Sequence, residues 1–227
     1  YMAMEFGGEG LKTLNMSDRI AICNLCVEAG AKTALMEVDD ITREYLKEHG
    51  RTPKYEFKSD DDAQFAKVYD IDLSTIKPIV AKPHFVDSVV DAKECVGTHI
   101  DEAFLGSCNN GRIEDLRAGA KVIEGKKVHP LVRFLVVPAS ASVYEQALEE
   151  GLLKIFMDAG AIVMNPNCSV CWGSCQGVIG ENEVLISTGT RNFKGRAGHK
   201  DSYVYLASAA TVTASAIKGE IATADMV

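Results

Sequence analysis

Three of the seven cysteines in this chain occupy predicted loops in which they could bind a metal. Cys108 follows the apolar run EAFLG, while Cys168 and Cys171 form a C-x-x-C pair after the run AIVM. Thiolates are typical ligands of iron–sulfur clusters and of structural zinc. Because structural zinc takes four ligands, a zinc site would also need Cys175, Cys95 or a histidine. The spacing equally permits a redox C-x-x-C motif, or cysteines that pack as small apolar side chains.

Two arginines follow another apolar run, VLIST. Arg191 and Arg196 stand on either side of a glycine and could offer two planar guanidinium groups to anionic oxygens, since arginine suits bidentate recognition of carboxylates. The alternative is that both are solvated surface arginines. We favour carboxylate binding because this loop is expected to leave the same sheet edge as the loops that carry the cysteines.

Asn24 and Glu28 form a third candidate group. Their spacing of four residues places both side chains on one face of a helix predicted over 17–29. Apolar residues lie near that face, so the alternative is a boundary position with a solvated carboxylate. Cys175 is expected to start a helix and to bury its thiol. The five histidines show no ligand spacing and are interpreted as surface residues: His49, His84, His99, His129 and His199.

The first 80 residues predict short elements separated by polar loops. Ser17 is the expected N-cap of the first helix, and Asp40 is the expected N-cap of a second helix that Gly50 ends. The residues from 77 to 85 are expected to form a linker, which places a domain boundary near residue 80. The other expected elements are strands over 1–6, 35–38 and 71–74 and a brief helix over 63–69.

The remainder of the chain, 81–227, alternates apolar strands with helices. Continuous apolar strands in such an alternation predict an α/β fold with a mainly parallel sheet that is covered on both faces. Sites in such sheets form at the carboxyl ends of the strands. The expected strands cover 102–107, 133–137, 161–164, 183–187 and 203–206, and the expected helices cover 113–123, 142–158 and 209–217.

The composition excludes several classes of protein. With 47% hydrophobic residues the chain is not intrinsically disordered, and charges interrupt every apolar run that could span a membrane. A net charge of −8 argues against nucleic-acid binding. Seven cysteines cannot all pair, and no secretory leader opens the chain, so a reducing, cytoplasmic location is expected.

Three motifs together resemble the aconitase superfamily. They are the segments GSCNNGR at 106–112, CSVC at 168–171 and RNFKGR at 191–196. They are most similar to the branch that contains the large subunits of 3-isopropylmalate dehydratase and homoaconitase. The segments at 16–32 and 203–221 also resemble this branch, and the likeness runs from about Glu5 to Ala224, or roughly the second half of a large subunit.

The resemblance implies a three-layer α/β/α fold and a specific site. Cys108, Cys168 and Cys171 would bind a [4Fe–4S] cluster with one iron lacking a protein ligand, and Thr190 would donate a hydrogen bond toward a cluster sulfide. Arg191 and Arg196 would hold substrate carboxylates. Two further roles are implied upstream: Asn24 would hydrogen-bond near the cluster, and Glu28 would help to handle the iron-bound water.

The implied activity is that of a hydro-lyase. It would reversibly remove and re-add water on a hydroxy di- or tricarboxylate such as isopropylmalate or homocitrate, in leucine or 2-oxo acid chain-elongation biosynthesis. The implied partner is a small subunit carrying the swivelling domain. Because that domain and the family's N-terminal domain have no match in this sequence, the chain alone is expected to be inactive.

The sequence departs from the family pattern at several positions. Asn109 stands where the family usually has threonine, and Thr190 stands where it usually has asparagine. Cys23 and Cys26 flank Asn24 and are interpreted as packing residues. Two other functions stay open: a metal-binding regulatory module that binds RNA or protein on the same fold, and a thiol redox protein that uses these two cysteines.

Overall fold

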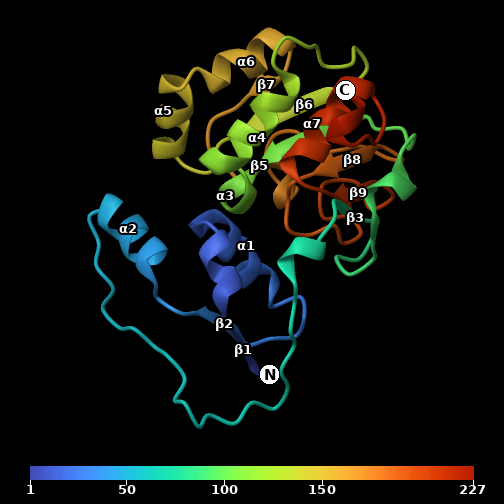
Figure 1. The fold of residues 1–227 in the computed structure, drawn as a ribbon. Helices are drawn as coiled ribbons and strands as arrows, with labels where there is room; N and C mark the ends of the chain where they lie inside the picture. The colour runs from blue at the N-terminus through green and yellow to red at the C-terminus, as the bar shows by residue number, and fades with distance from the viewer. The chain divides into compact units, whose positions relative to one another are not determined.

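The computed structural model describes residues 1–227, which divide into two compact units, Tyr1–Ile76 and Lys77–Val227 (Figure 1). The units differ in how much they bury. The second contains a seven-stranded sheet with two hydrophobic core clusters, whereas the first contains a two-stranded sheet and few buried side chains. None of the helices combines the length and the apolar character that a membrane span requires.

The first unit is built on two parallel strands, β1 (Ala3–Phe6) and β2 (Thr33–Met36), and two helices, α1 (Met16–Leu25) and α2 (Asp40–Glu48). Its 3₁₀ turns cover Glu9–Thr13 and Leu73–Thr75.

The expected caps and ends of these helices need correction. The N-cap of α1 is Asn15, which forms a reciprocal capping box with Asp18, so Ser17 lies inside the helix. Asp39, one residue before the expected Asp40, accepts from the backbone of Thr42 and caps α2. The helix expected over 63–69 and the strand expected over 71–74 do not form.

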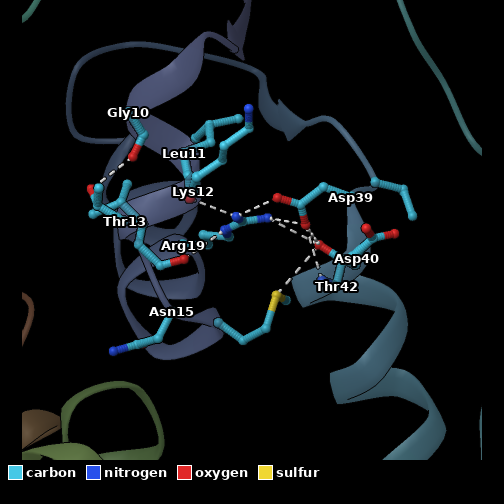
Figure 2. A network of polar contacts seen from close by, with 12 residues as sticks. Gly10, Leu11, Lys12, Thr13, Asn15, Arg19, Asp39, Asp40 and Thr42 are labelled. Carbon is cyan, nitrogen blue, oxygen red and sulfur yellow. Dashed lines mark hydrogen bonds and ion pairs between the residues drawn. The ribbon is translucent and has the colours of Figure 1, made fainter.

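One buried arginine ties the elements of this unit together (Figure 2). Arg19 on α1 is only 2% exposed, and its five N–H groups make five hydrogen bonds. Two of them, each 2.7 Å, reach the carboxylate of Asp39, and the others reach the carbonyls of Leu11 and Leu14 and the hydroxyl of Thr42. This guanidinium holds the pKa of the Asp39 carboxyl well below its usual range. A single cation therefore joins the 3₁₀ turn, α1 and the start of α2.

The sheet of the second unit has the order β4-β3-β9-β8-β5-β6-β7. The five strands from β9 to β7 are parallel, while β3 and β4 are antiparallel additions at one edge. The segment from 77 to 85 is thus not a linker, since it contains β3. The bounds are β3 (Ile79–Ala81), β4 (Val89–Asp91), β5 (Glu102–Gly106), β6 (Arg133–Val137), β7 (Ile162–Val163), β8 (Val184–Ser187) and β9 (Tyr203–Leu206).

The helix expected over 142–158 is two helices. They are α5 (Ala141–Glu149) and α6 (Leu152–Ala159), separated at Gly151, whose φ of +75° is left-handed and cannot continue an α-helix. The other helices are α3 (Ser107–Asn110), α4 (Ile113–Ile123) and α7 (Ala209–Lys218), and further 3₁₀ turns cover Ala92–Cys95, Ser169–Cys171 and Ala224–Met226.

The two faces of the sheet bury different partners. On one face, apolar residues of β5, β6 and β8 pack against α4, α5, α6 and α7. On the other, Phe104 and Leu135 pack with Val170, Ile179 and Ala197, which come from the long segments that precede and follow β8. The α/β class with a mainly parallel sheet is confirmed. Within this unit the outer layer on the second face consists of loops, because these segments are rich in Gly, Asn and Cys and do not form long helices.

A charged cluster lies at the amino ends of the central strands. The Arg133 guanidinium donates to Glu102 at 2.8 Å and to both oxygens of Glu183 at 2.9 and 2.8 Å. Glu102 is fully buried, and its second oxygen has no hydrogen-bond partner. Burial raises the pKa of Glu102 to about 7, although Arg133 opposes the shift.

Candidate functional site

The carboxyl ends of three parallel strands carry the predicted site residues of the second unit. In the order β8-β5-β6-β7, the strand β5 is followed by Cys108, β7 by Cys168 and Cys171, and β8 by Thr190 and Arg191. All five strands of the parallel part run the same way, so these loops leave one edge of the sheet.

The segment that carries Cys108, the one-turn helix α3, is fixed by contacts with the end of β8. Thr188 is buried, and its hydroxyl accepts from the N–H of Gly106 at 2.9 Å and lies 3.2 Å from the carbonyls of Gly106 and Asn110. The Asn110 amide also donates to the Thr188 carbonyl. Thr188 is not among the residues predicted from the sequence. The only signal for it is a hydroxyl placed directly after an apolar strand.

The loop that carries Cys168 and Cys171 folds around another buried hydroxyl. Ser169 is fully buried, its N–H donates to Asn167 Oδ1 at 2.6 Å, and its Oγ donates to the carbonyl of Gln176 at 2.7 Å. Its φ of +42° is unusual for a residue with a side chain. The hydroxyl therefore closes the loop, and Ser169 is a second positioning residue that sequence analysis did not identify.

The three predicted cluster ligands are close enough for their charges to interact. The pKa of the Cys168 thiol is raised, first by partial desolvation and then by the neighbouring thiols of Cys108, Cys171 and Cys175. The guanidinium of Arg196 opposes this shift. Cys175 was expected to be buried at the start of a helix, but it is exposed and lies outside any helix. One sheet edge thus carries four thiols beside one cation.

These thiols do not form a cage for a single ion. No group of three or more His, Cys, Asp or Glu side chains is tight enough to hold one metal ion. Zinc would draw every thiolate to within about 2.3 Å of one atom. An iron–sulfur cluster has several metal atoms and accepts thiolates at separate corners. Three accessible thiols from two loops suit a cluster better than a single ion, and Cys108, Cys168 and Cys171 are the residues that could hold it.

Arg196 contacts the backbone of the cysteine loop. Its Nε donates to the carbonyl of Cys171 at 2.7 Å, and the side chain is half-exposed. Gly173 allows this approach: it has a φ of +72°, and a Cβ there would lie 2.2 Å from the carbonyl oxygen of Arg196. Arg196 thus positions the loop, a contact that its spacing from Arg191 did not predict.

The other residues of this segment are also placed by polar contacts. Arg191 is half-buried, and its Nη1 donates to Oγ1 of the buried Thr190 at 2.7 Å. Asn192 is fully buried, and its amide donates to the carbonyls of Lys82 and Phe85 at 2.8 and 3.3 Å. Polar contacts therefore anchor Arg191, Asn192 and Arg196 in the fold, while the residues from 193 to 195 between them are exposed.

Asn24 and Glu28 lie in the first unit. Asn24 is exposed on the last turn of α1. The helix ends at Leu25, and Glu28 lies in the turn that follows, where its N–H donates to the Leu25 carbonyl. Glu28 therefore lies past the end of the helix that was predicted to carry both side chains. The helix ends earlier than predicted because a turn over 26–30, closed by Gly30, follows it. In this turn the carbonyl of Cys26 accepts from the N–H groups of Ala29 and Ala31.

The Cys23–Cys26 pair does not have the environment of a redox motif. Redox C-x-x-C cysteines have lowered pKa values at a helix N-terminus. Here the pair lies at the C-terminal end of α1, and burial raises the pKa of both thiols. Cys26 is 6% exposed, and its thiol donates to the carbonyl of Ile22. These contacts favour the packing interpretation.

Comparison with known families decides the classification of this fold. The model of the aconitase family (aconitate hydratase) matches residues 2–98 and 92–219, which together cover most of the chain. The chain belongs to the aconitase family. Every candidate residue of this aconitase-family chain, from Asn24 to Arg196, lies inside the matched ranges.

The similar curated proteins are named 3-isopropylmalate dehydratase large subunit. The protein of Aquifex aeolicus is 49% identical, and the match covers all of this chain and 54% of the Aquifex protein. The protein of Caldicellulosiruptor saccharolyticus is 47% identical, and the match covers 97% of this chain and 52% of that protein. One protein of Archaeoglobus fulgidus is 45% identical, and the match covers 98% of this chain and 54% of that protein. The aconitase-family chain thus spans about half the length of the curated relatives it matches.

Proposed function

We propose that this chain is part of the large subunit of a 3-isopropylmalate dehydratase, a hydro-lyase of leucine biosynthesis in the reducing cytoplasm. The observation that carries the proposal is the gathering of Cys108, Cys168 and Cys171 beside Arg196 at one sheet edge. The names of relatives at 45–49% identity support the same activity. The alternative of a purely regulatory metal-binding module has no comparable support.

The three cysteines fit a [4Fe–4S] cluster by their chemistry. All three thiols are exposed or half-exposed, and they come from two loops, so they can take separate corners of one cluster. With three protein ligands one iron stays open, as a catalytic metal site requires. When bound, such a cluster would supply a Lewis-acidic iron to polarise a substrate hydroxyl.

The polar residues near the cysteines would bind the substrate and donate hydrogen bonds to the cluster. Arg191 and Arg196 would bind and orient substrate carboxylates, since guanidinium groups pair with carboxylates in a bidentate way. Their positive charge would also stabilise negative charge that develops as a proton leaves carbon. The Thr190 hydroxyl accepts from Arg191 and keeps its own proton, which it would donate toward a cluster sulfide.

Asn24 and Glu28 are proposed site residues of the first unit. The half-buried Glu28 would hold or release the proton of the departing water, and the exposed Asn24 would donate a hydrogen bond near the cluster. These roles rest on the match to the family over residues 2–98.

The substrate would be isopropylmalate, and the partner a small subunit that completes the site. Homocitrate is the competing substrate, because it presents similar carboxylates to the two arginines. The test uses the full-length large subunit combined with its small subunit under anaerobic conditions. We expect isopropylmalate to turn over with a kcat/KM at least about tenfold above that of homocitrate, a difference of about 1.4 kcal/mol. A complex that retains its cluster but dehydrates neither compound would overturn the proposal.

A further inference from the structure

Cys175 is a thiol that the proposed mechanism does not use. It is exposed and stands four residues after Cys171, in the loop that also holds Cys168. Three thiols suffice for a cluster with an open iron, so a fourth at the same edge needs another explanation.

The hydrogen bonds of this loop bring Cys175 back toward Cys168. The Ser169 hydroxyl reaches the carbonyl of Gln176 at 2.7 Å, so the residues that precede each, Cys168 and Cys175, lie on adjoining stretches of backbone. Between them the chain turns through the bonds from the N–H of Cys171 to the Cys168 carbonyl, 3.0 Å, and from the N–H of Gly173 to the Ser169 carbonyl, 3.2 Å. The loop therefore closes between Ser169 and Gln176, the residues that follow Cys168 and Cys175.

Cys175 lies within electrostatic range of the Cys168 thiol, and Cys108 and Cys171 act on that thiol more strongly. By contrast, Cys95 is buried at 5% exposure and does not act on Cys168. Cys95 is thus a suitable matched control, because it lies in the same unit and its thiol should not form the disulfide.

We propose that Cys175 is a resolving thiol, which forms a reversible disulfide with Cys168 when the cysteine set carries no cluster. The oxidant would be a low-molecular-weight disulfide such as oxidised glutathione. One protein thiolate attacks a glutathione sulfur and expels one glutathione thiolate, and the second protein thiolate then displaces the other. In total, two protein thiols become one disulfide, and one glutathione disulfide becomes two glutathione thiols.

The bond would have two consequences for the site. The sulfur of Cys168 in the disulfide cannot bind iron, so Cys108, Cys168 and Cys171 cannot hold a cluster until the bond is reduced. The bond also keeps both sulfurs from the irreversible sulfinic and sulfonic states. The link to cluster assembly rests on the proposed function, whereas the disulfide itself depends only on the loop.

The experiment measures the linkage in the cluster-free chain. The protein is reduced, equilibrated without oxygen in buffers of reduced and oxidised glutathione, quenched in acid and alkylated. Trypsin leaves Cys168, Cys171 and Cys175 in one peptide, residues 155–191, and places Cys108 in another. Chymotryptic cleavage after the exposed Trp172 then separates Cys175 from the other two.

We expect two fewer alkylated thiols than the seven of the reduced chain, with Cys175 joined to the peptide that contains Cys168. The bond should persist in Cys171→Ser and in the control Cys95→Ser, and it should vanish in Cys168→Ser. Circular dichroism checks that each variant is folded. A Cys175 that stays alkylated while Cys168 is oxidised, or a bond that persists in Cys168→Ser, would overturn the proposal.

Iron and sulfide uptake by the oxidised and reduced chains separates this proposal from the proposed function. We expect uptake only after reduction. If the linked peptide forms and the reduced chain binds no iron, the cluster assignment fails and the disulfide stands. If the reduced chain binds iron and no linked peptide forms, the disulfide fails and the cluster assignment stands.

Discussion

At the scale of single residues, two side chains have roles that depend on their exact partners. Arg196 is both a cation that acts on the Cys168 thiol and a hydrogen-bond donor to the backbone of Cys171. Glu102 is a fully buried carboxylate with one oxygen paired to Arg133 and one unpaired. The chemistry of each follows from what surrounds it more than from its residue type.

Replacing Arg196 by lysine should loosen the cysteine loop while keeping the charge. Lysine cannot reproduce the Nε bond to Cys171, and a hydrogen bond to a charged group contributes about 1.5–3 kcal/mol. We expect the rate of cluster loss in air, followed by visible absorbance, to rise several-fold. Lys194→Gln in the same exposed segment is the matched control and should leave the rate unchanged. An equal rate in Arg196→Lys and the parent chain would argue against the positioning role.

The pKa of Glu102 predicts a pH dependence of stability. Because its pKa is raised to about 7 from an ordinary 4.5, the folded chain binds more protons than the unfolded chain between these values. Its contribution to stability is therefore fully present below the lower value and is lost as the pH rises through the higher one.

Glu102→Gln should remove this dependence. We expect the unfolding free energy of the variant, relative to the parent chain, to increase between about pH 5 and about pH 8 in denaturant titrations. The exposed Glu94→Gln is the control and should show a flat difference. If the difference for Glu102→Gln is flat or falls with pH, burial does not raise the pKa of this carboxyl as described.

At the scale of elements, loops and helices are fixed by a few polar anchors. In the first unit the guanidinium of Arg19 joins α1, α2 and a 3₁₀ turn (Figure 2). In the second unit the hydroxyls of Thr188 and Ser169 hold the two cysteine loops. Each anchor is a buried group, and its bonds are directed mainly at backbone carbonyls, backbone N–H groups and one carboxylate.

Arg19→Met should destabilise the first unit by about 3–5 kcal/mol, because removing one partner leaves the Asp39 carboxylate without its counter-charge. The exposed Arg43→Met is the control and should cost less than about 1 kcal/mol. The destabilisation in each variant is measured by hydrogen exchange of the amides in α1 and α2, with the strands of the second unit as an internal reference. Equal exchange in the two variants would contradict the anchoring role.

Gly173→Ala should disrupt the cysteine loop through a steric clash as well as a strained backbone. A Cβ at this position would lie 2.2 Å from the Arg196 carbonyl oxygen. Gly125→Ala is the matched control, because Gly125 has a similar φ of +75° but open space around it. We expect a clearly larger loss of cluster binding in Gly173→Ala, measured as iron and sulfide per chain. Comparable losses would indicate that backbone strain alone matters.

The limits of prediction from the sequence are also visible at this scale. The strands at Arg133–Val137 and Tyr203–Leu206 and the helix at Ile113–Ile123 are confirmed to the residue, because clear apolar patterns and capping residues mark them. The break at Gly151 was not predicted, since the apolar pattern continues across it. The helix expected over 63–69 fails because its apolar residues find no packing partner, as the exposed Phe65 and Val68 indicate.

At the scale of the whole molecule, the chain joins a parallel sheet that gathers the cysteines to a first unit that carries Asn24 and Glu28. The motifs predicted the family, and the alternation of strands and helices predicted a parallel sheet whose carboxyl ends meet at one edge. They did not predict Thr188, whose hydroxyl bonds a segment 82 residues away, nor Ser169 and the exposure of Cys175, which depend on how an irregular loop folds. Because the chain spans about half of its relatives, the proposed activity belongs to the assembled enzyme.

The central claim, that Cys108 joins Cys168 and Cys171 around one cluster, is tested by anaerobic reconstitution of this chain and its single Cys→Ser variants. Iron and sulfide content and the electron paramagnetic resonance of the reduced cluster are measured together. We expect one [4Fe–4S] cluster per chain in the parent, in Cys95→Ser and in Cys175→Ser, and near-complete loss in Cys108→Ser, Cys168→Ser and Cys171→Ser. A Cys108→Ser chain that keeps a full cluster while Cys168→Ser loses it would contradict the claim.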